Sequence, residues 1–220
     1  MPVYLDDFYA QKLIRRIRAI YPIAPLLVIA DGVHDADTQE LVESCGGTYY
    51  LGDRLKPQTF GCAWTIRMLE LMQQYLEGDI WVKLDADSML YREIDLAGIT
   101  SDFDLAGAIY NNGHFDYTRG GCRIYNPLAA EKILRSGLLS DYKYVWEQRF
   151  GYLRYCNRMK LPGDPPGEVF EAIHSEDFCL GDVGKQLGLK LVEVPDLCVM
   201  FRESVPDNSD LRYSVVHPVR

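Results

Sequence analysis

The chain lacks a long apolar run, and it lacks an excess of basic residues. None of its apolar stretches reaches about 18 residues, the length that a membrane-spanning helix needs, so the sequence predicts no membrane span. The formal net charge is −9, whereas proteins that bind nucleic acid carry a basic face. We therefore expect no nucleic-acid partner, although a bound cation would still let an acidic protein hold a phosphorylated ligand.

Motifs that would pair the cysteines are also absent. The six cysteines are scattered without a Cys-x-x-Cys pair, which excludes the usual zinc pattern and a small disulfide framework. The N-terminal stretch carries Asp6 and Asp7 and has no apolar core of a secretory signal. We therefore expect a reduced, cytoplasmic protein, and peripheral association with a membrane surface stays open.

Helical and extended patterns alternate along the 220 residues. This alternation predicts an α/β fold with a mostly parallel sheet flanked by helices, in a single domain over 1–220. A Pro/Gly-rich loop over 162–167 is a candidate lid. The patterns predict helices over 4–21, 38–45, 60–76, 127–134, 141–159 and from 175, and strands over 26–30, 48–51, 80–84, 103–110, 122–125, 189–194 and 197–201.

The most informative stretch is the apolar strand over 80–84, which ends in Asp85-Ala86-Asp87. In an open α/β sheet, ligands bind beyond the carboxyl ends of the strands. Residues two apart in a strand point the same way, so Asp85 and Asp87 could converge on one cation. Carboxylate oxygens suit Mg²⁺ or Mn²⁺, which commonly bridge a protein to phosphates. The plain alternative is a solvated turn after a strand.

Other polar motifs lie at strand ends and helix starts. Asp31-Gly32 follows the strand over 26–30, and Lys56 lies in the loop before the long third helix. Arg119-Gly120-Gly121 precedes the strand over 122–125, and Ser175-Glu176-Asp177 opens a helix. His217 lies in the polar tail.

In this order the motifs resemble those of nucleotide-sugar glycosyltransferases of the GT-A fold, in the style of the inverting family-2 enzymes. The resemblance implies that Asp31 holds the nucleotide base and that Lys56 lies along the diphosphate. It implies that Asp85 and Asp87 form the metal-binding Asp-x-Asp motif, in which Asp85 binds either the ribose of the nucleotide or the metal through a water. It also implies an acceptor-side turn at Gly120 and Gly121, a catalytic base at Asp177 with Glu176 as a second candidate, and a metal ligand at His217.

The resemblance implies transfer of a sugar from a UDP- or GDP-sugar to a hydroxyl of a carbohydrate or glycoconjugate acceptor. Mn²⁺ or Mg²⁺ would neutralise the departing diphosphate, and a carboxylate would take the proton of the acceptor hydroxyl. Glu176 and Asp177 point in different directions on a helix, so we expect only one of them to reach the acceptor.

One feature departs from that family. Its members start with a strand, whereas this chain begins almost inside its first helix, so we expect the first strand to be missing. A truncated start, or another segment in the place of that strand, would also account for this departure. A sheet edge left uncovered in this way is a surface on which a second copy could pair, so a homo-oligomer stays open.

Two alternatives stay open. In a haloacid-dehalogenase-like phosphatase, Asp85 would be the nucleophile and Asp87 the acid/base, although Lys83 and Met89 depart from that motif. A non-catalytic binding or scaffold protein with a GT-A fold would show weak or absent metal-dependent nucleotide binding.

Overall fold

The computed structural model describes most of the chain. The described residues are 1–3, 7–55, 61–96, 99, 102–111, 115–140, 176–200 and 213–217. Lys56, the helix expected over 141–159 and the loop over 162–167 lie outside these ranges, so what was expected of them stays a prediction.

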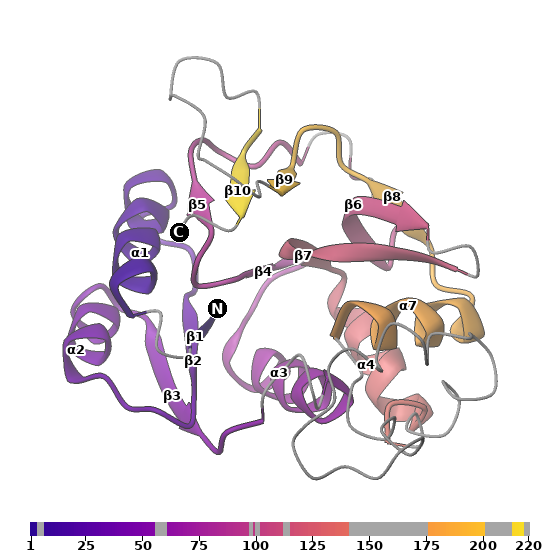
Figure 1. Ribbon diagram of the computed structural model, residues 1–220, viewed down its shortest axis with the longest axis horizontal. Coiled ribbons are helices and arrows are strands. Elements are labelled where there is room, and N and C mark those ends of the chain that lie inside the picture. The colour runs from indigo at the N-terminus through magenta and orange to yellow at the C-terminus, as the bar shows by residue number, and fades with distance from the viewer. Residues whose placement is uncertain are drawn as a thin grey trace, which may run out of the picture.

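The N-terminal part is a parallel sheet with its crossover helices. Strands β1 (Pro2–Val3), β2 (Leu27–Asp31) and β3 (Thr48–Gly52) are hydrogen-bonded in the order β1-β2-β3. Helices α1 (Asp7–Ile20) and α2 (Ala36–Ser44) join them and lie together on one side of this sheet (Figure 1). The side chain of Asp35 caps α2 by accepting a hydrogen bond from Thr38 N–H at 2.6 Å.

The expectation that the first strand is missing was wrong. Pro2 and Val3 pair in parallel with Ile29 and Ala30 of β2. Two residues are too few to show any hydrophobic periodicity, so the sequence could not reveal this strand.

The second sheet is mixed. It contains β4 (Trp81–Leu84), β7 (Asp116–Tyr125), β6 (Leu105–Asn111) and β8 (Leu191–Glu193), in the order β4-β7-β6-β8. β7 is antiparallel to both β4 and β6, and only β6 and β8 are parallel. The α/β class with a parallel sheet flanked by helices is confirmed. Only the β1-β2-β3 sheet is parallel throughout, because in the second sheet β6 and β7 follow each other closely and pair as antiparallel neighbours.

A third, small sheet lies beside the second one (Figure 1). It consists of β5 (Met89–Leu90), β10 (Val215–His217) and β9 (Cys198–Met200), with β10 in the middle. β10 is antiparallel to β5 and parallel to β9. This sheet brings the late residue His217 back to the end of β4.

Helices and sheet faces enclose two apolar clusters. Helices α3 (Gly61–Tyr75), α4 (Pro127–Ser136) and α7 (Glu176–Leu187) pack in one cluster, and α1 packs in the other. Strand β2 is buried on both faces, with Leu27 and Ile29 in the first cluster and Val28 in the second. This alternation explains its continuous apolar sequence. Among the described helices, none is long and apolar enough to cross a membrane.

Candidate active site

The two carboxylates after β4 lie in a tight turn. Asp85 N–H donates to Gly121 O at 3.1 Å, and Ser88 N–H donates to Asp85 O at 3.0 Å. The turn then enters β5, whose Met89 pairs with Val216 of β10. A turn rather than an extended strand therefore carries Asp85 and Asp87, and the β5–β10 pairing brings His217 to it.

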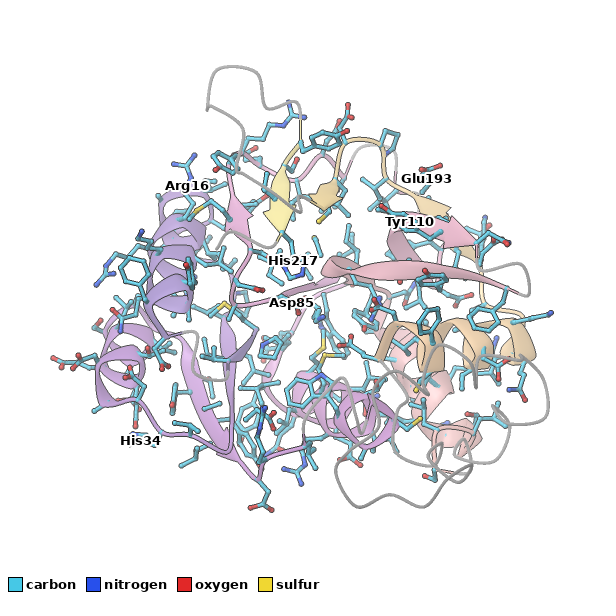
Figure 2. The ribbon with its side chains drawn as sticks, in the orientation of Figure 1. Arg16, His34, Asp85, Tyr110, Glu193 and His217 are labelled. Carbon is cyan, nitrogen blue, oxygen red and sulfur yellow. The ribbon has the colours of Figure 1, made fainter. Side chains whose placement is uncertain are left out.

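His217 faces both carboxylates. Its Nδ1 lies 3.1 Å from Asp87 Oδ1 and 3.2 Å from Ser88 Oγ. Its Nε2 lies 3.7 Å from Asp85 Oδ2. Figure 2 shows Asp85 and His217 close together near the middle of the molecule, far from His34 beside α2. The structure therefore brings together the three residues that the sequence predicts as metal ligands.

Asp85 is held by Lys83 and by the backbone of β7. Lys83 Nζ lies 2.6 Å from Asp85 Oδ1, and Gly121 N–H donates to Asp85 Oδ2 at 2.8 Å. Burial by itself would raise the pKa of this carboxyl. The charges of Lys83 and His217, with the hydrogen bonds from Lys83 and Gly121, outweigh burial and hold the pKa of Asp85 well below its usual range.

Gly121 gives His217 the space that it occupies. Gly120 and Gly121 lie inside β7, so the prediction that they form a turn before the strand was wrong. Gly121 has φ +92°, and a Cβ added there would lie 2.8 Å from His217 Cβ and 3.1 Å from Cys198 Sγ. A glycine is required here both by the backbone conformation and by the packing of the imidazole.

A buried set of charges lies behind this turn. Lys83 Nζ lies 3.2 Å from Glu176 Oε2, and the guanidinium of Arg123 donates to Glu176 Oε1 at 2.6 Å. The same guanidinium donates to Asp177 Oδ1 at 2.5 Å. Glu176 and Asp177, the first two residues of α7, are thereby attached to β4 and β7.

Arg123 is fully buried, and its donors are used by nearby groups. It donates to Thr118 Oγ1 at 2.5 Å, to Thr118 O at 2.6 Å and to the hydroxyl of Tyr125 at 3.1 Å. Burial would lower the pKa of Arg123, but Tyr125 and the charges of Glu176 and Asp177 raise it well above its usual value. Burial raises the pKa of Tyr125 to about 12, so its hydroxyl stays protonated at neutral pH.

Asp31, the predicted contact of the nucleotide base, lies at the end of β2 and is buried. One carboxylate oxygen accepts a hydrogen bond from Leu55 N–H at 2.6 Å, and the other pairs with Arg54. Its described contacts therefore anchor the segment after β3. The predicted role of Asp31 in nucleotide binding stays a prediction.

The donor groups at the turn are compatible with a hard divalent cation. Two carboxylates and an imidazole supply oxygen and nitrogen ligands. The 3.1 Å between Asp87 Oδ1 and His217 Nδ1 is close to the separation of neighbouring ligands about 2.1 Å from an octahedral Mg²⁺. As the described side chains stand, no group of three His, Cys, Asp or Glu is arranged to hold an ion. In this arrangement both oxygens of Asp85 accept from protein groups, one from Lys83 and the other from Gly121 N–H.

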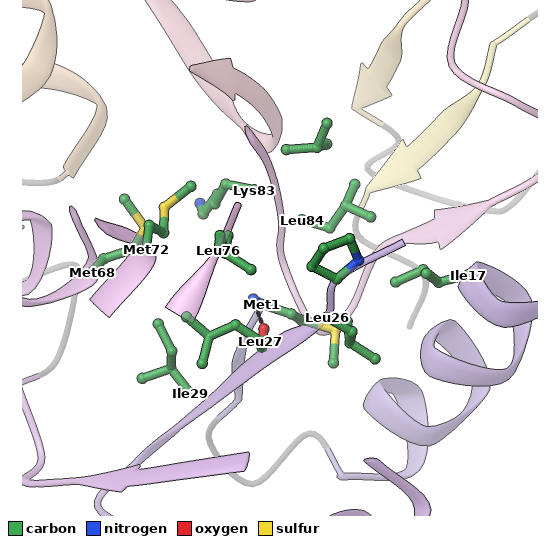
Figure 3. A pocket seen from close by; sticks show the side chains of 12 residues that line it. Met1, Ile17, Leu26, Leu27, Ile29, Met68, Met72, Leu76, Lys83 and Leu84 are labelled. Carbon is green, nitrogen blue, oxygen red and sulfur yellow. Dashed lines mark hydrogen bonds between the residues drawn. The ribbon is translucent and has the colours of Figure 1, made fainter. Parts of the chain in front are cut away.

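Lys83 also lines a small cavity between β2, α3 and β4 (Figure 3). Its volume is about 60 Å³, and its walls are mostly apolar, with Leu27, Met68 and Leu84 among them. Pockets for ligands of drug size occupy about 300–1,000 Å³. The cavity is therefore a gap in the core and too small for a nucleotide sugar.

Sequence reasoning overlooked Lys83 and Arg123 as members of the site. The signal was present, because Lys83 and Arg123 each have apolar residues on both sides in the sequence, and charged residues are almost never buried without partners. What the sequence could not supply was the partner, since Lys83 and Glu176 are far apart in the chain.

The pairing of Asp85 makes stability depend on pH. Because the pKa of Asp85 is lowered in the folded protein, the stability that its ion pair contributes is fully present above about pH 4, the ordinary aspartate pKa. We expect wild type to exceed Asp85→Asn in unfolding free energy at pH 7. The difference should shrink as the pH falls below 4. Urea titrations of both proteins between pH 3 and 7 measure it, and a constant difference would contradict the expectation.

Replacing Gly121 with Ala should move His217. We expect Gly121→Ala to lower the free energy of unfolding by about 2–4 kcal/mol, from the positive φ together with overpacking. Gly46→Ala is the matched control, since Gly46 has φ +72° with nothing within 4 Å of an added Cβ. It should cost only the backbone part, about 1–2 kcal/mol. Urea denaturation compares the two, and equal losses would show that contact with His217 does not matter.

Comparison with known proteins supports the fold. No family model matches the chain, and no curated protein matches its sequence. Among solved structures, the chain is similar to an active-site mutant of LgtC, a GT-A glycosyltransferase, with a TM-score of 0.57 and 14% sequence identity. The likeness covers 99% of this chain and 84% of that one. At this identity the likeness concerns the fold alone: the chain shares its fold with a GT-A glycosyltransferase.

Proposed function

We propose that the chain is a nucleotide-sugar glycosyltransferase whose donor diphosphate binds at the turn after β4. The observation that carries the proposal is the convergence of His217 on Asp85 and Asp87, at the end of a strand of a GT-A-like fold. Strand ends are where open α/β sheets bind ligands. The three side chains come from two segments that are far apart in the chain, so a plain solvated turn does not explain their meeting.

The donor side of the site suits a divalent cation, Mn²⁺ or Mg²⁺. Asp87 and His217 would hold it, and Asp85 would join them by turning one oxygen away from its present partner. When bound, the cation supplies Lewis-acid neutralisation of the charge on the departing nucleoside diphosphate. The residues fit a UDP- or GDP-sugar equally well, because these contacts concern the diphosphate and not the base.

Asp177 is the better of the two candidate bases on α7. Its side chain is 24% exposed, whereas that of Glu176 is 8% exposed and receives both Lys83 and Arg123. Asp177 can therefore meet an acceptor from solvent. It would take the proton of a carbohydrate or glycoconjugate hydroxyl, whose oxygen displaces the nucleoside diphosphate at the anomeric carbon. A single displacement of this kind inverts the anomeric configuration.

Calorimetry of nucleotide binding tests the proposal. UDP and GDP are titrated with and without Mn²⁺ into wild type, Asp87→Ala and the control Asp102→Ala, whose side chain is 84% exposed. We expect binding that needs Mn²⁺ in wild type and in the control. Binding should weaken at least 100-fold in Asp87→Ala, because a central ligand is lost. Absence of nucleotide binding by wild type at every metal condition would overturn the proposal and favour the scaffold alternative.

The phosphatase alternative finds less support. Both oxygens of Asp85 already accept hydrogen bonds, from Lys83 and from Gly121 N–H, which is a poor arrangement for an attacking nucleophile. The fold is shared with a glycosyltransferase. An aspartyl-phosphate trapped on Asp85 would reverse this preference.

A further inference from the structure

The arrangement of charges behind the turn assigns Glu176 a role different from that of a base. Lys83 of β4 and Arg123 of β7 are directly opposite each other in the antiparallel pair. Like charges in this position repel, and both side chains are buried, with exposed fractions of 4% and 0%. A compensating carboxylate is therefore required between them.

Glu176 is that carboxylate. One of its oxygens lies 3.2 Å from Lys83 Nζ, and the other accepts from Arg123 at 2.6 Å. With both oxygens committed to buried cations, Glu176 has no oxygen directed at an acceptor hydroxyl.

The three residues form a connection with two partly exposed ends. Beyond Lys83 lies Asp85, with a side chain 23% exposed, and beyond Arg123 lies Asp177, 24% exposed. The order along the connection is Asp85, Lys83, Glu176, Arg123, Asp177, so negative and positive groups alternate. In the proposed reaction, Asp85 serves the donor side and Asp177 serves the acceptor side. The three buried residues between them serve neither side directly.

We infer that Lys83, Glu176 and Arg123 act together as a buried ionic bridge that fixes the distance and orientation of Asp177 relative to Asp85. The three are positioning residues. They keep Asp177, the base on the acceptor side, in a fixed position relative to Asp85 on the diphosphate side, although none of the three touches substrate. This inference rests on the proposed transfer reaction, in which Asp85 and Asp177 serve opposite ends of one displacement.

Substitutions in a connected bridge and substitutions of independent residues differ in how their effects combine. Once one member is removed, the connection is broken, and removing a second adds little. Misplacement of a reacting group by about 1 Å costs about 100-fold in rate. We therefore expect Lys83→Met and Glu176→Gln each to lower kcat for sugar transfer by about 10- to 100-fold. The kcat of the double variant should lie within about 3-fold of the kcat of the less active single variant.

The test is a double-mutant cycle with two readouts. One is kcat for transfer, and the other is the unfolding equilibrium constant in urea without nucleotide or metal. Lys190→Met, Glu131→Gln and their double variant form the matched control cycle, because these two residues are in separate exposed ion pairs. In the control cycle the effects should multiply. In the cycle of Lys83→Met and Glu176→Gln, the effects should not multiply. The change in the unfolding equilibrium constant of the double variant should be at least about 5-fold smaller than the product of the two single-variant changes.

Several results would overturn the bridge. One is a kcat within 3-fold of wild type for either single variant. Another is that the two effects on kcat multiply in the double variant, which is expected if Glu176 acts as an independent base. Should Glu176→Gln fail to fold, Glu176→Asp keeps the charge but is too short to reach both cations. Its kcat should fall about 10-fold, and an unchanged kcat contradicts the inference. Failure of the proposed function is distinct, because wild type itself would then neither bind nucleotide nor transfer sugar.

Discussion

Asp177→Asn should lower kcat for sugar transfer by about 10²- to 10⁴-fold, the contribution that a positioned general base makes. Asparagine keeps the shape of the side chain and can still accept the hydrogen bond from Arg123, which aspartate accepts at 2.5 Å. Donor binding should therefore change by less than about 3-fold, because the donor side lies at Asp85, Asp87 and His217. Transfer assays with calorimetry of UDP or GDP in Mn²⁺ separate the two effects.

Asp102→Asn is the control for the loss of a charge, since Asp102 is 84% exposed and pairs only at the surface with Lys190. Its kcat should match that of wild type. A kcat for Asp177→Asn within 3-fold of wild type would remove Asp177 as the base. The anomeric configuration of the product, read by NMR, is an independent check, and retention would contradict a single displacement.

Arg123→Met is expected to destabilise the fold strongly. Methionine nearly fills the volume of the arginine stem but leaves Glu176 and Asp177 without their shared cation. It also leaves Thr118 and Tyr125 without the donors they receive in the core. Breaking a buried ion pair by removing one partner costs about 3–5 kcal/mol. Urea denaturation at pH 7 should show a loss of this size in the free energy of unfolding.

Arg135→Met is the matched control. Arg135 is 79% exposed and pairs with Glu131 one turn earlier on α4. Exposed pairs of this kind contribute at most about 0.5 kcal/mol, so this variant should unfold close to wild type. Similar stability of the two variants would mean that the interior around Arg123 does not depend on its charge.

Elements with a long or continuous pattern were predictable. The strand over 80–84 was predicted from its apolar run and is found as Trp81–Leu84. The helix expected over 60–76 is found as Gly61–Tyr75, because its apolar residues recur at the helical period and pack in the core. Local periodicity is a property of the sequence, so it can be recognised without knowing which other elements the segment packs against.

Three short strands, β1, β5 and β10, were not predicted. β1 and β5 have two residues each, and β10 has three. Such segments show no period of their own and are strands only because a neighbour supplies hydrogen bonds. The expected strand over 122–125 is longer in the structure, Asp116–Tyr125, because pairing with β6 extends it through the two glycines.

By itself, the sequence determined the α/β class, the placement of two carboxylates just after a buried strand, and an acidic start of α7. Composition and periodicity did not place His217 beside those carboxylates, which only the family resemblance implied. The tertiary structure brings it there, since β10 reaches them by pairing between β5 and β9. It also decided that Lys83 and Arg123 share Glu176. The physical reason is that strand register and burial bring distant charges together, and a buried charge is tolerated only where such a partner has been brought to it.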